Sequence, residues 1–437
     1  MTMANAFGSD AFSRLAAEAQ ALVRRREKAL GPAYRLFYQR PLHFVRGEGV
    51  WLYDADGAAY LDAYNNVASV GHGNPRVLEA IARQAATLNT HTRYLHEKIL
   101  DYAEALTATF PPQLSQAMFT CTGSEANDLA FRIARSYTGG EGVIVTAHAY
   151  HGVTAAVSAF SPSLGAGVDL GAHVRTVPAP LAVAAGGGGP EGFVRGVEAA
   201  IADLRRHGIR PAMLIVDTIF SSDGVVSEPK GFLAKAAAAI RSAGGLFVAD
   251  EVQPGFGRTG EAMWGFLRHE ITPDMVTIGK PMGNGYPIGG LVARPEIIAD
   301  FGTRSRYFNT FGGNPVAAAA GLAVLDVIAS DGLVASAREV GAYLLSGLEA
   351  AVRGDPRFGG VRGAGLFIGV DVLEEGAPSA AAAAAIVNGM RERGVLISAS
   401  GAGANILKIR PPLIFSRANA DLLLRAFRET IEAAQAK

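Results

Sequence analysis

The sequence places an amine and a carboxylate at the ends of two short apolar runs. Lys280 follows the run 275–279, and Asp250 ends the run 246–250. A lysine that is partly buried at a strand end has a lowered pKa and can act as a nucleophile. A lone lysine is more often a solvated surface charge, and an aspartate in this position is often only a helix cap. A functional interpretation of Lys280 and Asp250 therefore depends on the other residues that stand at strand ends.

Two further segments supply groups for an anion and for an aromatic ring. Gly123 and Ser124 follow the apolar run 116–121 and open a helical pattern, where free N–H groups and the helix dipole favour a phosphate. Tyr150, after the run 142–146, offers an aromatic face. Taken alone, a Gly-Ser pair at a helix start is more often an ordinary helix cap, and such a tyrosine is more often a structural residue than a functional one. Together with the amine and the carboxylate, they match the needs of pyridoxal 5′-phosphate: a phosphate cradle, a ring stacker, a carboxylate for the ring nitrogen and a nucleophilic lysine.

A parallel sheet would bring these residues together, because the carboxyl ends of parallel strands meet at one edge. Strands are expected at 116–121, 142–146, 213–217, 246–250, 275–279 and 289–293. Helical patterns lie between several of them, at 124–137, 191–207 and 230–243. This alternation, with nearly continuous Val, Ile and Leu in the strands, predicts an α/β fold with a mostly parallel central sheet covered on both faces.

The two ends of the chain have a different pattern. Residues 45–64 alternate as in a β-meander, and residues 361–373 predict a strand. Helices are predicted at 380–393 and 416–435, and a long helical pattern follows residue 320. The glycine-rich stretch 178–190 predicts a flexible surface loop.

From these patterns we expect two domains. The large cofactor-binding domain would comprise residues 66–320. The smaller α+β domain would be built from both chain ends, residues 1–65 and 321–437.

Composition excludes several classes of protein. Lys plus Arg and Asp plus Glu both total 40, so the net charge of zero argues against a nucleic-acid or anionic-membrane partner. A single cysteine, Cys121, excludes a disulfide framework and favours a reducing, cytoplasmic location. His148 and His151 have no obvious third ligand, so no metal site is expected. The apolar stretch 311–325 is too short to span a bilayer and predicts a buried helix.

Several motifs together resemble the class III pyridoxal-phosphate-dependent aminotransferases of fold type I. They are TGSEAN (122–127), AYHG (149–152), DEVQPGFGRTG (250–260), IGK (278–280) and FNTFGGNP (308–315). The similarity extends from about residue 35 to 430. Two stretches, 94–106 and 307–328, are similar to the subgroup of ω-aminotransferases that contains alanine–glyoxylate-type aminotransferases and amino-alcohol phosphate phospho-lyases.

The resemblance implies a role for each matching residue around the cofactor ring. Lys280 would form the Schiff base and move the proton during catalysis. Asp250 would pair with the pyridine nitrogen. Val252 and Tyr150 would pack on opposite faces of the ring, and Gln253 would reach the ring hydroxyl.

The resemblance also implies a phosphate site that is completed by a second subunit. Gly123 and Ser124 would bind the cofactor phosphate through backbone and hydroxyl groups. Thr310 would reach the phosphate in the neighbouring subunit, so a homodimer or a higher homo-oligomer is expected.

The residues expected to contact the substrate differ from the family pattern. Family members specialised for ω-amino acids carry a glutamate where this chain has Ser222, and an arginine where it has Lys408; Arg410 lies two residues further on. The usual glutamate–arginine gate is therefore expected to be absent. Lys408 and Arg410 are the candidates for binding the substrate anion, although both could equally be structural strand charges.

The activity expected first is an aminotransferase that moves an amino group from an amine or ω-amino acid to a keto acid such as pyruvate or glyoxylate. The alternative is a phospho-lyase acting on an amino-alcohol phosphate, for which Arg93, Lys408 or Arg410 would bind the substrate phosphate. An amino-acid racemase or epimerase would use the same cofactor. A non-catalytic binding protein is disfavoured by the intact Lys280 and Asp250.

Overall fold

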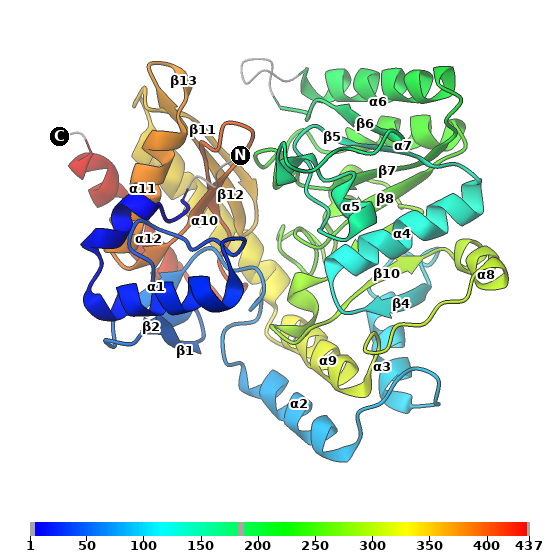
Figure 1. The fold of residues 1–437 in the computed structure, drawn as a ribbon, viewed down its shortest axis with the longest axis horizontal. Helices are drawn as coiled ribbons and strands as arrows, with labels where there is room; N and C mark the ends of the chain where they lie inside the picture. Colours follow the sequence, from blue (N-terminus) through cyan, green and yellow to red (C-terminus); the bar gives the residue numbers. More distant parts are fainter. Residues whose placement is uncertain (1–4, 182–187, 435–437) are drawn as a thin grey trace.

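A seven-stranded sheet forms the centre of the larger part of the chain in the computed structural model, which describes residues 5–181 and 188–434 (Figure 1). In spatial order the strands are β4 (Gln116–Thr120), β10 (Gly289–Ala293), β9 (Met275–Ile278), β8 (Leu246–Asp250), β7 (Pro211–Asp217), β5 (Gly142–Thr146) and β6 (Val174–Val177). Strand β10 runs antiparallel to β4 and β9, while the other neighbours pair in parallel. The predicted α/β fold with a mostly parallel sheet is confirmed.

Both faces of this sheet are buried, which explains the continuous apolar runs. Met213 and Ile215 of β7 join one core cluster, whereas Leu214 and Val216 join the other, because successive side chains point to opposite faces. The first cluster includes side chains of α4 (Gly123–Thr138), α5 (Ala155–Ser158) and α8 (Pro295–Arg304). The second includes side chains of α6 (Gly189–Arg206), α7 (Leu233–Ser242) and α9 (Pro315–Ser330). Two further helices, α2 (Pro75–Thr87) and α3 (Glu97–Thr107), pack on α9.

A smaller sheet joins the two ends of the chain. The meander β1 (Phe44–Glu48), β2 (Trp51–Asp54) and β3 (Ala59–Asp62) is present as predicted. Strand β3 pairs in parallel with β14 (Val395–Leu396), more than 300 residues away in the chain. The domain limits at residues 65 and 320 stay predictions.

The C-terminal part contains a third sheet, seen beside α10 and α11 in Figure 1. Its strands are β11 (Phe358–Ala364), β12 (Phe367–Glu374), β16 (Ile406–Ile409) and β15 (Ser398–Ser400), with β13 (Ala377–Pro378) beside β12. The accompanying helices are α10 (Leu333–Val352), α11 (Ala380–Glu392), α12 (Arg417–Ala433) and, from the N-terminus, α1 (Ala17–Leu30).

Three predicted elements differ in the structure. The single strand expected at 361–373 is a hairpin of two strands, because Gly365 turns the chain with a φ of +54°. The long pattern after residue 320 is split into α9 and α10 by a turn in which Gly332 has a φ of +61°. The helix expected from residue 230 begins at Leu233. Residues 182–187 of the expected glycine-rich loop lie outside the described residues.

Within the described ranges, no single helix is both long and apolar enough to span a membrane. Helices α9 and α10 meet that requirement only as a pair bent by 62°, and by length and composition alone.

Candidate active site

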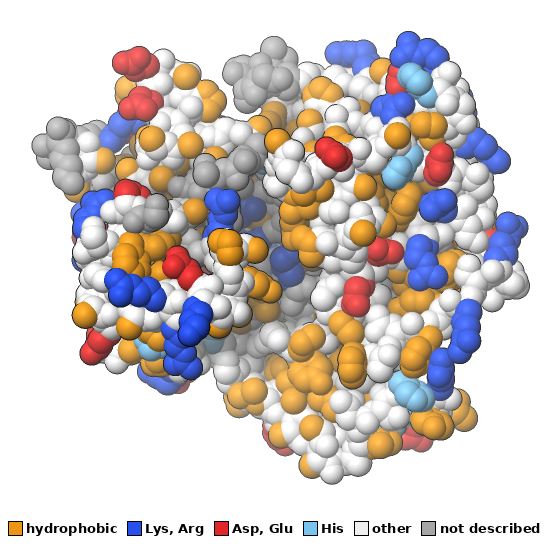
Figure 2. Space-filling model, in the orientation of Figure 1, with side chains coloured by type: hydrophobic (Ala, Val, Ile, Leu, Met, Phe, Trp, Pro, Cys, Tyr) orange, Lys and Arg blue, Asp and Glu red, His pale blue; other side chains and the backbone are white. Residues whose placement is uncertain are grey.

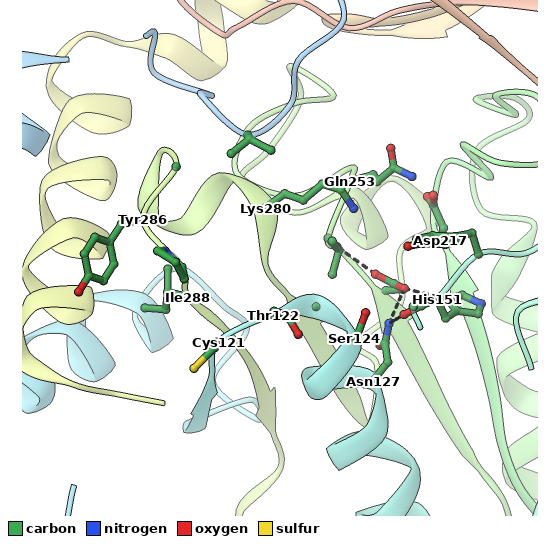
Figure 3. A pocket seen from close by; sticks show the side chains of 18 residues that line it. Cys121, Thr122, Ser124, Asn127, His151, Asp217, Gln253, Lys280, Tyr286 and Ile288 are labelled. Carbon is green, nitrogen blue, oxygen red and sulfur yellow. Dashed lines mark hydrogen bonds and ion pairs between the residues drawn. The ribbon is translucent and has the colours of Figure 1, made fainter. Parts of the chain in front are cut away.

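A cavity of about 330 Å³ lies where β4, β5, β7, β8 and β9 end at their carboxyl edge (Figure 3). Its lining includes seven of the predicted site residues: Gly123, Ser124, Tyr150, Asp250, Val252, Gln253 and Lys280. Residues from five separate strand ends therefore meet in one space, as the parallel topology requires.

The carboxylate of Asp250 is held by three donors. Its Oδ2 atom accepts hydrogen bonds from Asn127 Nδ2 at 2.9 Å and from the His151 Nδ1 atom at 2.7 Å. Its Oδ1 atom accepts one from the Val252 backbone N–H at 3.1 Å. All of these groups except the backbone are buried side chains, so the carboxylate is fixed in place. A fixed, buried carboxylate suits a protonated ring nitrogen.

Asn127 and His151 were not predicted as site residues, although both lie within the motifs that carried the resemblance. Asn127 comes one helical turn after Gly123 on α4, which brings its amide to the same end of the sheet. His151 directly follows Tyr150 and also stacks at a tilt against Phe160. Their part in the site follows from contacts that only the folded chain makes.

Lys280 begins the short helix η5 (Lys280–Gly283), separated by one residue from the end of β9. Figure 3 shows its amine pointing toward the side of the cavity that holds Asp217 and Gln253. Burial lowers the pKa of the Lys280 amine, and the positive charge of Arg410 lowers it further, while Asp250 and Asp217 oppose the change. The neutral, nucleophilic form is therefore more available than in a surface lysine.

The N-terminus of α4 forms a tight cradle beside Gly279, the residue that precedes Lys280. Thr122 and Glu125 make a capping box, and Ser124 Oγ accepts a hydrogen bond from the Val153 backbone N–H at 3.2 Å, which leaves its own hydrogen for a ligand. A Cβ atom on Gly123 would lie 2.9 Å from Val252 Cγ2. One on Gly152, whose φ is +140°, would lie 2.4 Å from Ser124 Oγ. The glycines thus keep this space open, and the cradle fits a phosphate.

The two cations of β16 and its continuation lie next to the cavity but are not among its lining residues. Arg410 donates to Gln253 Oε1 and, through Nε and Nη2, to the Tyr64 carbonyl at 3.2 and 3.0 Å. The Lys408 ammonium lies 5.9 Å from the centre of the Phe367 ring. Burial lowers the pKa of Lys408 to about 7, and the charge of Arg410 contributes in the same direction.

The remaining predicted residues lie elsewhere. The backbone carbonyl of Ser222 accepts a hydrogen bond from the Gly401 N–H at 3.1 Å, and Ser222 does not line the cavity. Thr310 is exposed and does not line the cavity. Arg93 is exposed as well and stacks 3.7 Å above the Phe308 ring, so it is not part of this pocket. Among the described residues, no three His, Cys, Asp or Glu side chains are placed to hold a metal ion.

Fold and site together define an enzyme of the fold type I, pyridoxal-phosphate-dependent class. Residues 37–431 match the model of the aminotransferase class-III family, and the chain belongs to that family. Membership of the family implies pyridoxal phosphate as the cofactor.

Three similar proteins carry two different activity names. An alanine–glyoxylate aminotransferase 2-like protein of Drosophila melanogaster is 39% identical over 94% of this chain and 87% of its own. Ethanolamine-phosphate phospho-lyase homolog 1 of Caenorhabditis elegans is 34% identical over 96% of both chains. The solved structure of a phospholyase from Arthrobacter in complex with phosphoethanolamine is 44% identical, covers 94% of this chain and 99% of its own, and superposes with a TM-score of 0.91.

Proposed function

We propose that this protein is a pyridoxal-phosphate-dependent lyase that eliminates phosphate from an amino-alcohol phosphate. The observation that carries the proposal is the similarity to the Arthrobacter phospholyase, whose structure contains phosphoethanolamine, at 44% identity over nearly the whole chain. The similarity to the nematode phospho-lyase homolog supports the same substrate class.

The charges beside the cavity support an anionic substrate. Lys408 and Arg410 are two residues apart on one extended segment, and both lie within 6 Å of the Phe367 ring, so their side chains share one face. Position 222 is a serine, so it adds no carboxylate to that of Asp217, whose charge acts on both cations. Two neighbouring cations suit a phosphate dianion better than a single carboxylate.

The resemblance implies a role for each of these lining residues toward the cofactor, and the proposal adopts those roles. Ser124 and the α4 N-terminus would hold its phosphate, Val252 and Tyr150 would lie on the two ring faces, and Asp250 would keep the ring nitrogen protonated. When bound, pyridoxal phosphate supplies an electron sink for negative charge that develops beside the substrate nitrogen.

Different residues of this chain carry out the separate parts of the elimination. The Lys280 amine removes a proton from the carbon that bears the substrate nitrogen. The electron pair of that C–H bond forms a double bond to the adjacent carbon as its bond to the phosphate oxygen breaks, and Lys408 and Arg410 bind the phosphate as it leaves. Substrate and water give an aldehyde, ammonia and inorganic phosphate, so no keto acid is consumed.

The proposal is tested by incubating the cofactor-loaded enzyme with phosphoethanolamine and without any keto acid. We expect inorganic phosphate and ammonia to be released in equal amounts. Release of neither product, together with amine transfer that requires pyruvate or glyoxylate, would overturn the proposal.

The second candidate is the aminotransferase with pyruvate or glyoxylate as acceptor. The 39% identity to the Drosophila alanine–glyoxylate aminotransferase 2-like protein favours it. Alanine or an ω-amino acid as donor, with keto-acid-dependent turnover and no phosphate release, would distinguish this activity from the lyase.

We also propose that the enzyme works as a homodimer. Large apolar side chains are exposed around α3 and before α9, including Leu95 at 99%, Phe311 at 67% and Tyr94 at 66%. Figure 2 shows hydrophobic side chains gathered over α2, α3 and α9. Thr310 lies within this surface, where a second copy would bring it to the neighbouring phosphate cradle.

Sedimentation of the purified enzyme tests the dimer. The Leu95→Asp and Phe311→Asp double variant is expected to dissociate and to bind the cofactor more weakly, whereas Val45→Asp, exposed on β1, serves as the control. A monomeric wild-type enzyme with full cofactor affinity would contradict this assembly.

A further inference from the structure

A chain of hydrogen bonds links the cation Arg410 to the carboxylate of Asp217. Arg410 Nη1 donates to Gln253 Oε1, and Gln253 Nε2 donates to Ser221 Oγ. Ser221 Oγ in turn donates to Asp217 Oδ2. The four side chains come from three separate parts of the chain and meet at the edge of the cavity, which both Gln253 and Asp217 line.

The direction of each hydrogen bond is set by the chemistry of its ends. A guanidinium group can only donate, and an ionised carboxylate can only accept. The Gln253 amide must therefore present its oxygen to Arg410, and its nitrogen must face Ser221, whose hydrogen is used by Asp217. One hydrogen of Gln253 Nε2 is then left for a ligand in the cavity.

The Asp217 end of the chain is firmly anchored. Asp217 ends β7 beside Asp250 in the parallel register, and its carboxylate also accepts the backbone N–H groups of Ile219 at 3.0 Å and Ser221 at 3.1 Å. Burial raises the pKa of Asp217, but the hydrogen bonds from Ser221 and Ile219 favour the ionised form.

The loop after β7 is fixed from two other directions. Asp223 accepts a hydrogen bond from Thr146 Oγ1 of β5 at 2.8 Å. Arg362, paired with Asp371, donates to the carbonyl groups of Gly224 and Val225. Ser221 is therefore presented from a rigid loop, which a positioning residue requires.

We propose that Ser221 and Asp217 are positioning residues that lock the Gln253 amide with its nitrogen available to the cofactor ring oxygen. This inference rests on the proposed binding of pyridoxal phosphate, but it holds for either the lyase or the aminotransferase. Without the serine hydroxyl, the amide keeps Arg410 on its oxygen but loses the partner that holds its nitrogen in place. The bound cofactor then loses a donor that stabilises the unprotonated ring oxygen.

The test is a pH titration of the visible absorbance of the bound cofactor, recorded without substrate. In Ser221→Ala, the midpoint is expected to move to higher pH by about half a unit to one unit, the equivalent of one ordinary hydrogen bond. The cofactor dissociation constant, measured by equilibrium dialysis, is expected to rise about threefold to tenfold. Ser222→Ala is the matched control, because the neighbouring serine contacts the fold through its backbone carbonyl.

A double-mutant cycle separates positioning from a general structural role. Gln253→Leu alone is expected to shift the midpoint in the same direction, and adding Ser221→Ala to it is expected to cause no further shift. The proposal is overturned if Ser221→Ala titrates like the wild type, or if its shift adds fully to that of Gln253→Leu. A wild-type protein that binds no cofactor would instead refute the proposed function.

Discussion

His151 Nδ1 and Asp250 Oδ2 lie 2.7 Å apart in the buried wall of the cavity, although 99 residues separate them in the sequence. The contact fixes one oxygen of the carboxylate, and Asn127 holds the same oxygen from α4. Asp250 therefore has its orientation set by two elements, α4 and the loop after β5, which also contact each other through Asn127 Nδ2 and the His151 carbonyl.

This contact predicts that substitution of Asp250 and substitution of His151 will lower kcat by different amounts. Asp250→Asn removes the charge that would keep the cofactor nitrogen protonated, so kcat is expected to fall by about a thousandfold or more. His151→Asn removes only one of two side-chain donors, and a loss of about tenfold is expected. Steady-state kinetics of both variants check this order. Equal losses would show that the histidine does more than orient the carboxylate.

Lys280→Ala is expected to abolish the visible absorbance of the cofactor-bound enzyme and nearly all turnover. The reason is that Lys280 carries the amine with a lowered pKa that faces the cavity. Lys235→Ala, at an exposed position of α7, is the matched control and should leave both properties unchanged. Full activity in Lys280→Ala would refute the assignment of this site.

The Lys408 ammonium predicts a pH dependence of substrate binding. Because burial lowers its pKa to about 7, the side chain is charged below that pH and becomes neutral above it. A phosphate ester is already mostly a dianion in this range, so the KM for phosphoethanolamine is expected to rise about tenfold between about pH 7 and 9.

The variant Lys408→Arg provides the control for this titration. A guanidinium keeps its charge throughout the range, so the rise in KM should be flattened. If the wild type and the variant show parallel profiles, Lys408 does not bind the substrate anion.

The buried Arg258 predicts an effect on the stability of the folded chain. It is buried and donates to Asn66 Oδ1 at 2.7 Å, to the Leu366 carbonyl at 3.3 Å and to the Pro411 carbonyl. Arg258→Met would leave buried acceptors without partners, each at a cost of about 1–3 kcal/mol. Scanning calorimetry should show a clear fall in Tm. Arg428→Met, exposed on α12, is the control and should show little change.

The position of part of the site could be predicted, because residues at the carboxyl ends of parallel strands must lie along the same edge of the sheet. Lys280 follows, and Asp250 ends, apolar runs that were expected to be parallel strands buried on both faces, and the carboxyl ends of such strands meet at one edge of the sheet. The same reasoning failed at residues 361–373, where a single apolar run contained a glycine turn and folded as a hairpin.

The orientation of the side chains could not be predicted from the same patterns. Gln253 was expected to serve only the cofactor ring, but its amide also joins Arg410 to Ser221. Arg410 is 157 residues from Gln253, so their contact depends on how the C-terminal part packs on the large sheet.

The sequence by itself determined the fold class, six of the seven strands of the central sheet, and the residue types that stand at the strand ends. It could do so because hydrophobic periodicity and motif spacing are local properties. The tertiary structure alone decided that Asp217 and Ser221 anchor Gln253, that His151 holds Asp250, and that Lys408 and Arg410 lie beside the cavity. These contacts join segments far apart in the chain, and their geometry is fixed only when the strands are ordered and the core is packed.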